Sequence, residues 1–318
     1  MERPVLTARE AAGYLEALDN VLLLTHVRPD GDTIGSAAAL CRALRDCGQT
    51  AYLLPNPEIT ATYAPYAAPY WAPEGWEAEH IVSVDIADVS LLPENAKPYQ
   101  ERIELAIDHH PSQGFFARNT CLEADSAACG EIVYEIIQHL TALTADIALP
   151  LYVAVSTDCG GFQYGNTTAR THRIAAALMD VVDVAAVNKA LFRTKSRVRL
   201  AMESRMVADM KLFDHERVVV MEIPLALRQE MQATDADIEE LSALPALVEG
   251  TDCGVTLREL DGGKIKVSVR TGPRVDACAL CRILGGGGHH AAAGATVDGT
   301  LDEVRMAVLA AYRKVTGA

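Results

Sequence analysis

Acidic and imidazole side chains gather at four places in the first half of the sequence. Asp30 and Asp32 share one loop, in which Pro29 and Gly31 favour a tight turn that can aim both carboxylates at a common point. Carboxylates with a few imidazoles suit hard or borderline cations, of which Mn²⁺ fits best and Mg²⁺ next. The candidate ligands and their neighbours are His26, Asp30, Asp32, Asp85, Asp108, His109, His110 and Asp158.

The number of candidates decides how many cations such a site could hold. One cation needs three or four protein ligands and some open positions, so six or seven candidates suffice for two cations if one carboxylate bridges them. Two cations roughly 3.5–4 Å apart promote the in-line attack of water on phosphorus. They lower the pKa of a bridging water and stabilise charge on the attacking and leaving oxygens. The pattern therefore predicts two-metal hydrolysis of a phosphoester.

Single acidic and histidine residues have a simpler interpretation. A lone Asp after a strand is usually a helix cap or a turn former, and Asp88, which precedes VSLL, is expected to be one. His80 and His139 are expected to be packed, satisfied side chains. The ordered set of four clusters is much harder to explain in this way.

Apolar strands are expected to end at these clusters. Residues 21–26 (VLLLTH) form one such run, and the segments HIVSVDIAD and ELAIDHHPS contain the next two. Each run leads directly into candidate ligands. Because ligands of open α/β sheets bind at the carboxyl ends of the strands, this arrangement is a first indication of a site.

Helices are expected between and after the strands. Residues 33–47 have helical spacing and Gly48 is a plausible stop, while 126–140 suit a helix with Ser126 as N-cap. Residues 144–157 also favour a helix, although LYVAV alone would equally suit a strand. Strands that alternate with helices predict a parallel sheet with helices on its faces.

Two domains are expected, because 318 residues are too many for one ordinary core. The predicted fold class is α/β, with an N-terminal parallel-sheet domain at 1–185, a helical connector at 186–212 and a smaller C-terminal α/β domain at 213–318. The connector is expected to fray around Lys195–Ser196. The elements expected in the C-terminal domain are a strand at 218–223, a hairpin turn at Asp261-Gly262-Gly263 and helices near 276–284 and 301–315.

Composition narrows the class of partner. The formal net charge of −15 disfavours long duplex DNA as a partner and favours small ligands. The first residues lack the plan of a signal peptide, and no run approaches the ~18 apolar residues of a membrane span, so a cytoplasmic protein without a membrane partner is expected. Cys278 and Cys281 lack a second close pair, which disfavours a structural zinc site. An apolar connector helix could support a homodimer.

Five motifs carry a resemblance to a known family. THVRPDGDTIGS, SVDIAD, IDHHPS and STDCGGFQYGNTTARTH resemble, in this order, the four motifs of the DHH phosphoesterases, most of all those of the NrnA-type oligoribonuclease/pAp phosphatase branch. GGGGHHAAAGA resembles the glycine-rich motif of the DHHA1 domain. The resemblance extends from about residue 5 to residue 315. It is highly specific for the superfamily and less specific for the substrate.

The resemblance implies a role for each matching residue of the N-terminal domain. Asp85 would bridge the two cations, Asp108 would orient the cluster without binding directly, and His110 would face the scissile phosphate as general acid or charge stabiliser. Gly35 and Ser36 would shape the helix start beneath the metals. The remaining ligands would be His26 and Asp30 for the first cation, and Asp32, His109 and Asp158 for the second.

In the C-terminal domain the resemblance implies a substrate-holding segment. Consecutive glycines let backbone N–H groups approach a phosphate, while Arg and His add charge. The residues concerned are Arg270, Gly286, Gly287, Gly288 and His289. Three positions depart from the expected pattern, namely Cys159, Thr271 and His290, and none of them removes a predicted ligand.

The function implied is the hydrolysis of short oligoribonucleotides, pApA and 3′-phosphoadenosine-5′-phosphate, so short RNA or small nucleotides are the expected partners. Cleavage of cyclic di-AMP needs no change to the metal site and stays an alternative. A nucleotide-binding sensor built on an inactive phosphoesterase is another, although no ligand is missing. Inorganic pyrophosphatase is disfavoured because no Ser-Arg-Lys motif occurs, and a RecJ-type exonuclease because no basic track does.

Overall fold

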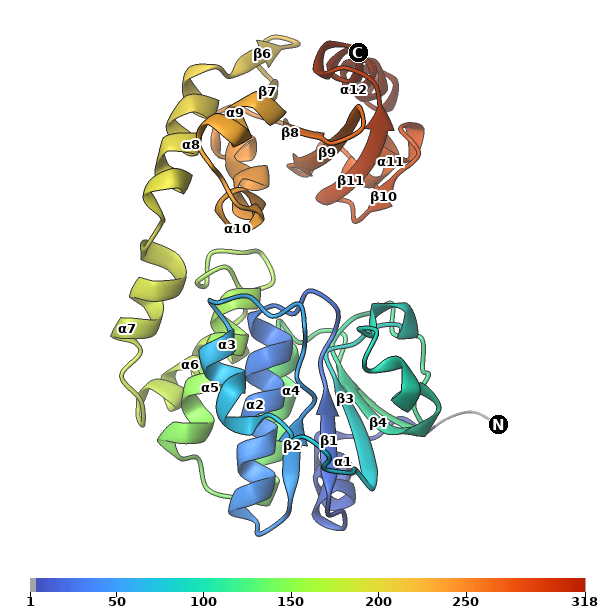
Figure 1. Cartoon of the computed structure of the whole chain (residues 1–318), viewed down its shortest axis with the longest axis vertical. Helices are drawn as coiled ribbons and strands as arrows, with labels where there is room; N and C mark the ends of the chain where they lie inside the picture. Colours follow the sequence, from blue (N-terminus) through green and yellow to red (C-terminus); the bar gives the residue numbers. More distant parts are fainter. Residues whose placement is uncertain (1–3, 318) are drawn as a thin grey trace. The chain divides into compact units, whose positions relative to one another are not determined.

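A computed structural model describes residues 4–317 of the chain. They form two compact units, one that ends at Thr194 and one that begins at Lys195 (Figure 1). Each unit has its own sheet. In the described part of the chain, no helix combines the length and the apolar character that crossing a bilayer requires.

The first unit is built on a five-stranded sheet whose pairings are all parallel, as the alternation of strands and helices predicted. The strand order is β2-β1-β3-β4-β5. The strands are β1 (Val21–Leu24), β2 (Ala51–Leu53), β3 (His80–Val84), β4 (Ile103–Asp108) and β5 (Asn119–Leu122).

Helices make up most of the remainder of this unit. The α-helices are α1 (Ala8–Glu16), α2 (Gly31–Asp46), α3 (Ala64–Ala67), α4 (Cys129–Leu140), α5 (Ala145–Asp158), α6 (Ala169–Met179) and α7 (Ala185–Asn188). The 3₁₀ segments are η1 (Ala68–Tyr70), η2 (Val89–Leu91) and η3 (Lys97–Arg102), and η4 (Lys189–Arg193) is a π-helix.

The side-chain alternation of the strands builds two cores. Val21 and Leu23 of β1 join the main core with α1, α2, α4, α5 and α6, whereas Leu22 and Leu24 join a smaller core with η2 and η3. All four are buried, because a strand with both faces covered needs apolar residues at every position. Figure 1 shows α2 and α4 beside the sheet. The long helices thus lie on one face, where they can present side chains at the strand ends.

Close packing of α2 against α5 fixes the start of α2 in this unit. A Cβ on Gly35 would lie 2.3 Å from the carbonyl oxygen of Pro150 and 2.8 Å from the amide nitrogen of Ala154. Only glycine allows that approach. Asp30 and Asp158, at the start of α2 and the end of α5, are thereby held on neighbouring helices.

The second unit has a six-stranded mixed sheet of order β10-β11-β9-β8-β7-β6, in which only β7 and β8 pair in parallel. The predicted hairpin around residues 261–263 is present as β8 and β9. The strands are β6 (Lys211–Phe213), β7 (Val218–Ile223), β8 (Cys253–Leu260), β9 (Lys264–Thr271), β10 (Gly287–Gly288) and β11 (Ala292–Asp298). The helices are α8 (Arg197–Ala208), α9 (Leu225–Glu230), α10 (Asp235–Ile238), the 3₁₀ segment η5 (Glu239–Leu247), α11 (Ala277–Ile283) and α12 (Leu301–Thr316).

Most predicted elements are confirmed, including the helix over 144–157, and Asp88 caps η2 as expected. The predicted start of the helix at 126–140 is wrong, because α4 begins at Cys129 and Ser126 is not its cap. His139 is also wrongly predicted, since it is exposed in the last turn of α4. Between α7 and α8 the helix is interrupted at 194–196, and the role of 186–212 as a separate connector stays a prediction.

Substitution of Gly35 by alanine should destabilise the first unit. The new methyl group must displace the backbone of α5, and overpacking of this kind costs about 1–3 kcal/mol. Gly13→Ala is the matched control, because Gly13 lies in α1 with no atom near its missing Cβ and should gain about 0.5–1 kcal/mol. Thermal unfolding of the full chain should show opposite shifts, and equal shifts would contradict the packing described here.

Candidate metal centre

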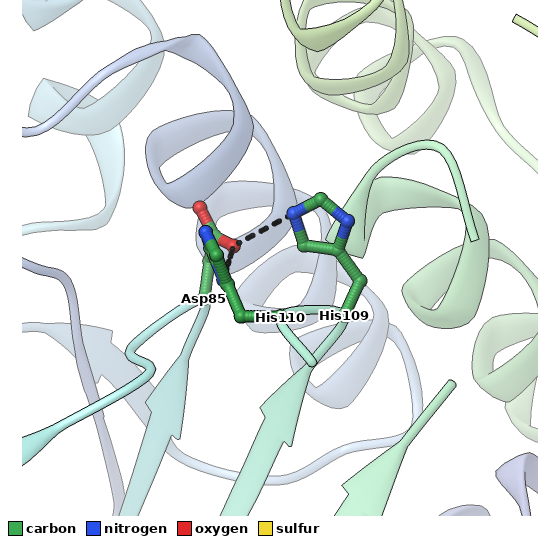
Figure 2. Close-up of side chains that lie close together, drawn as sticks. All are labelled: Asp85, His109 and His110. Carbon is green, nitrogen blue, oxygen red and sulfur yellow. Dashed lines mark ion pairs between the residues drawn. The ribbon is translucent and has the colours of Figure 1, made fainter. Parts of the chain in front are cut away.

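The carboxyl ends of β3 and β4 bring the first candidates together. Asp85 directly follows β3, Asp108 is the last residue of β4, and His109 and His110 follow it. Asp85 Oδ1 lies 3.6 Å from His109 Nε2 and 3.5 Å from His110 Nδ1 (Figure 2). Two neighbouring parallel strands therefore point their terminal side chains at one place, as the sequence indicated.

The start of α2 holds Asp30. Its carboxylate accepts hydrogen bonds from the amides of Asp32 (3.0 Å) and Thr33 (3.2 Å), which makes Asp30 the N-cap of the helix. Desolvation by the surrounding protein would raise the pKa of Asp30, although the side chain is 55% exposed. The interaction with His26 and these two amides outweigh that effect, so the net pKa lies below the ordinary value. Asp30 is therefore held as an anion.

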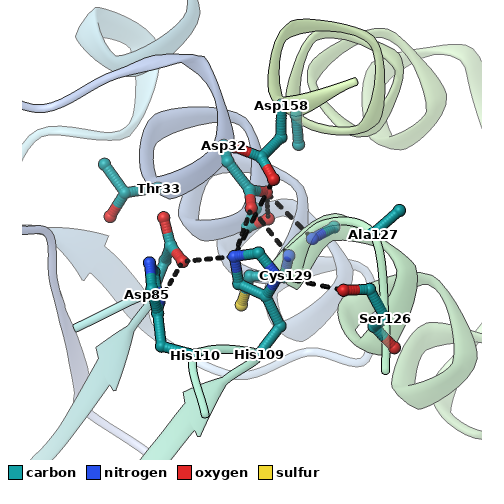
Figure 3. A network of polar contacts seen from close by, with 12 residues as sticks. Asp32, Thr33, Asp85, His109, His110, Ser126, Ala127, Cys129 and Asp158 are labelled. Carbon is teal, nitrogen blue, oxygen red and sulfur yellow. Dashed lines mark hydrogen bonds and ion pairs between the residues drawn. The ribbon is translucent and has the colours of Figure 1, made fainter. Parts of the chain in front are cut away.

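Asp32 joins two helices that are distant in sequence. It lies in the first turn of α2, yet its Oδ2 accepts from the amide of Cys129 (2.6 Å) and its Oδ1 from the amide of Gly130 (2.9 Å), as Figure 3 shows in part. These are the free amides at the start of α4, and an anion there is stabilised by the helix dipole. Asp32 thus supplies the cap that was assigned to Ser126, and this is why α4 begins at Cys129.

Two histidines are oriented in the same way. Nδ1 of His26 lies 2.8 Å from the carbonyl oxygen of Val27, and Nδ1 of His109 lies 3.1 Å from that of Ser126. A carbonyl can only accept, so Nδ1 carries the proton and Nε2 keeps its lone pair when the ring is neutral. In both residues Nε2 faces the carboxylates. This is the usual arrangement of a histidine that binds a metal.

The predicted ligands form overlapping groups whose candidate ligand atoms lie within 4.8 Å of one another. Asp85 belongs to two groups and faces the third through His109. The groups are His26, Asp30 and Asp85; Asp32, His109 and Asp158; and Asp85, His109 and His110. The structure therefore brings together all six residues that the sequence suggested as ligands.

Asp108 and His110 form a separate pair. Asp108 is fully buried, and its Oδ1 accepts from the amides of His109 and His110 and lies 2.7 Å from Nδ1 of His110. This hydrogen bond is the main reason that the pKa of His110 is raised. The His110 side chain is 39% exposed, against 16% for His26 and 14% for His109. His110 is the histidine that a molecule arriving from solvent would meet.

Burial and electrostatic repulsion act together on the carboxylates at the centre of the cluster. Burial raises the pKa of Asp85 well above its ordinary value, and the carboxylates of Asp32 and Asp30 raise it further. Burial, followed by the charges of Asp158 and Asp30, has the same effect on Asp32. The pKa of Asp158 is also raised, chiefly by burial. Carboxylates this crowded need positive charge to stay ionised.

A divalent cation fits these residues. The donors are carboxylate oxygens and imidazole nitrogens that already face inward. Asp85 Oδ1 is buried and has no hydrogen-bond partner, which is costly unless a cation uses it. Asp85 also has a positive φ of 60°, a conformation that costs non-glycine residues free energy and is frequent at functional sites.

The residues predicted to hold substrate gather at one edge of the second sheet. Arg270 of β9 pairs with Ala292 of β11, and the amide of His289 donates to the carbonyl of Ala292 across a tight turn. A Cβ on Gly286 or Gly288 would come within 2.5 Å of β11, so both glycines are required for strand packing. Gly287 has open space beside it and is the glycine whose backbone a ligand could approach.

Sequence reasoning missed several residues that hold the centre in place. Thr33 donates to the carbonyl of Val84 (2.8 Å), which fixes the strand end before Asp85. Gln113 donates to Asp108 from the loop after β4. Thr33 directly follows Asp30-Gly31-Asp32, and a threonine near the start of a predicted helix is a recognisable signal. Gln113 gives no such local signal.

Comparisons with known proteins agree with this geometry. Residues 20–155 match the model of the DHH family N-terminal domain, and residues 218–316 match that of the DHHA1 domain. A Thermus thermophilus protein named bifunctional oligoribonuclease and PAP phosphatase NrnA is 32% identical over 96% of this chain and 93% of its own length. A Bacillus subtilis protein of the same name is 24% identical over 88% and 90%.

A solved structure shows the same fold. The crystal structure of an exopolyphosphatase-related protein from Bacteroides fragilis superposes with a TM-score of 0.88 and covers 98% of this chain and 96% of that protein. The two sequences are 22% identical. The arrangement of elements in this chain therefore occurs in a second protein.

Proposed function

We propose that this chain, which belongs to the DHH family of phosphoesterases and carries a DHHA1 domain, hydrolyses phosphoesters in short oligoribonucleotides, pApA and 3′-phosphoadenosine-5′-phosphate with two divalent cations. The relatives named for the first and third of these activities align along nearly the whole chain. The family depends on metal ions, and the chain offers them carboxylate and imidazole ligands.

One observation carries the two-cation part of the proposal, namely that two ligand groups meet at Asp85. Its Oδ2 lies 3.7 Å from His26 Nε2, while its Oδ1 lies 3.6 Å from His109 Nε2. His26 and Asp30 would hold one cation, and Asp32, His109 and Asp158 would hold the other. The four aspartates carry one negative charge each when ionised, and two divalent cations would balance these four charges.

The remaining groups have separate tasks in this proposal. When bound, two divalent cations supply a water nucleophile at neutral pH and stabilise negative charge on the phosphate oxygens. Asp108 fixes the ring of His110 through Nδ1, so His110 can present Nε2 to a phosphate oxygen and donate a proton or stabilise charge there. Mn²⁺ is the proposed cation, because it accepts both carboxylate and imidazole ligands.

In the second unit we propose that Arg270 and His289 bind the nucleotide, together with the backbone around Gly287. Arg270 is half-buried, and its Nη1 donates to the carbonyl of Val269, which leaves other donors of the guanidinium for a phosphate. His289 is exposed at the adjacent turn. Gly286 and Gly288, which were expected to contact substrate, would act by shaping that turn.

A cytoplasmic location and a homodimer are part of the same proposal. All eight cysteines are free thiols, as is usual in a reducing compartment. Leu200 and Val207 of α8 are 52% and 44% exposed and would suit a contact with a second copy. The net charge of −15 supports small substrates over long duplex DNA.

Replacement of Asp85 by alanine should abolish turnover and leave the fold intact, because it removes the oxygen atoms that the two ligand groups share. The loss in kcat/KM should exceed the roughly 10–100-fold effect typical of residues outside the ligand shell. Asp88→Ala is the matched control, since Asp88 is exposed and only caps η2. Retained activity in the Asp85 variant would overturn the two-cation assignment.

Replacement of Arg270 by alanine should raise KM for 3′-phosphoadenosine-5′-phosphate by about 10–100-fold, as expected for the loss of a charged hydrogen bond to phosphate. The KM for a small generic phosphodiester such as bis(p-nitrophenyl) phosphate should not change. Arg274→Ala is the control, because Arg274 is 65% exposed and pairs with Asp252. An equal loss on both substrates would mean that Arg270 is structural.

The function itself is tested by hydrolysis assays with Mn²⁺, and with EDTA as the control. The substrates are 3′-phosphoadenosine-5′-phosphate, pApA, a five-residue RNA, cyclic di-AMP and pyrophosphate. Rapid, EDTA-sensitive turnover of the first two supports the proposal. Preferential turnover of cyclic di-AMP would make the chain a cyclic dinucleotide phosphodiesterase, and no turnover of any substrate despite bound metal would indicate a sensor.

A further inference from the structure

Gln113 is a buried amide with no place in the ligand groups described above. It is 5% exposed and lies in the loop that follows His110. Its Nε2 donates to the carbonyl of Ile86 (2.9 Å) and to Oδ2 of Asp108 (2.6 Å), and its Oε1 accepts from the amide of Phe115 (3.1 Å). The first two partners can only accept, so the orientation of the amide is determined.

The hydrogen bond from Gln113 to the carbonyl of Ile86 holds the backbone directly after Asp85. Asp85 has a left-handed backbone, and its own amide donates to the carbonyl of Ile107 in β4 (2.8 Å). The carbonyl of the following residue, Ile86, is held by Gln113. Hydrogen bonds on both sides of Asp85 therefore maintain a conformation that a free aspartate would rarely adopt. That conformation sets where the Asp85 carboxylate points.

The hydrogen bond from Gln113 to Asp108 affects the orientation of His110, because Asp108 also accepts from that ring. Asp108 is fully buried and uses Oδ1 for Nδ1 of His110 and for two amides. Among the residues that the structure describes, Gln113 is the donor to Oδ2 of Asp108. Without it, a buried carboxylate oxygen would lose its donor, which is costly and would weaken the hold of Asp108 on His110.

We infer that Gln113 is a positioning residue, whose single amide group links the backbone after Asp85 to the carboxylate that orients His110. It connects the ends of β3 and β4 and so fixes the shared metal ligand relative to the phosphate-facing histidine. The inference rests on the proposed two-cation hydrolysis. Gln113 would therefore influence metal affinity and kcat without contacting the substrate.

Gln113→Met tests this role, because methionine has a similar length and keeps the packing but donates no hydrogen bond. Mn²⁺ binding, measured by isothermal titration calorimetry without substrate, should weaken about 10-fold, and kcat for 3′-phosphoadenosine-5′-phosphate should fall about 10–100-fold. KM should change less than threefold. Gln138→Met is the matched control, since Gln138 is exposed on α4, and it should leave all three quantities unchanged.

A second variant separates positioning from folding. Gln113→Leu has a similar volume and lacks both the donor and the acceptor of the amide, so it should show the same loss of kcat and of Mn²⁺ affinity while folded by circular dichroism. In the double variant of Gln113→Met with Asp108→Asn, the fall in kcat should be smaller than the product of the two single-variant falls, because the two residues share one hydrogen bond.

Unchanged Mn²⁺ affinity and kcat in both folded Gln113 variants would overturn the inference, and so would additive losses in the double variant. Failure of the wild-type chain to hydrolyse any nucleotide would instead count against the proposed function. In that event the Mn²⁺ titration would still decide whether Gln113 positions the ligands.

Discussion

The repulsion between buried carboxylates is the constraint on which the first unit depends. Asp32 and Asp85 are 1% and 3% exposed, and Asp30 and Asp158 lie close by. Anions that leave water without compensation are strongly destabilised. Three of these carboxylates are tied to rigid elements: Asp30 to the amides that open α2, Asp32 to those that open α4, and Asp85 to the end of β3. The helices and strands are arranged so that these attachments converge.

Asp32 shows how the constraint shapes the fold as well as the site. Its carboxylate closes the start of a helix 97 residues later in the sequence and stays within 3.8 Å of Nε2 of His109. The same residue thus holds α4 against α2 and contributes a carboxylate to the cluster. A cation bound there would have to share Asp32 with two backbone amides, which leaves the carboxylate little freedom to move. The position of the Asp32 carboxylate is consequently set by the backbone of α4.

The sequence was sufficient for the features that depend on local periodicity. The apolar run at Val21–Leu24, the helix opened by Asp30 and the hairpin around Gly262 are visible as patterns, and the four ordered motifs contain the six residues that the structure brings together. The start of α4 was not predictable, because its cap comes from a distant residue. Gln113 was not predictable either, because an amide in a polar loop shows no sign that it will be buried between two strands.

The glycines at 286–288 show a different limit. A run of glycines is typical both of phosphate contact and of close strand packing. The structure requires Gly286 and Gly288 for strand packing, whereas Gly287 has free space beside it. The residue type alone could not show this difference, because it follows from which atoms of β11 a Cβ at each position would meet. The structural requirement for Gly286 and Gly288 holds whatever the substrate is.

The central claim is that two cations share Asp85, and anomalous diffraction from crystals grown with Mn²⁺ tests it most directly. The structure predicts two manganese peaks about 3.5–4 Å apart, one bound by His26 and Asp30 and the other by Asp32, His109 and Asp158, with Asp85 contacting both. A single peak, or two peaks of which only one contacts Asp85, would contradict the claim.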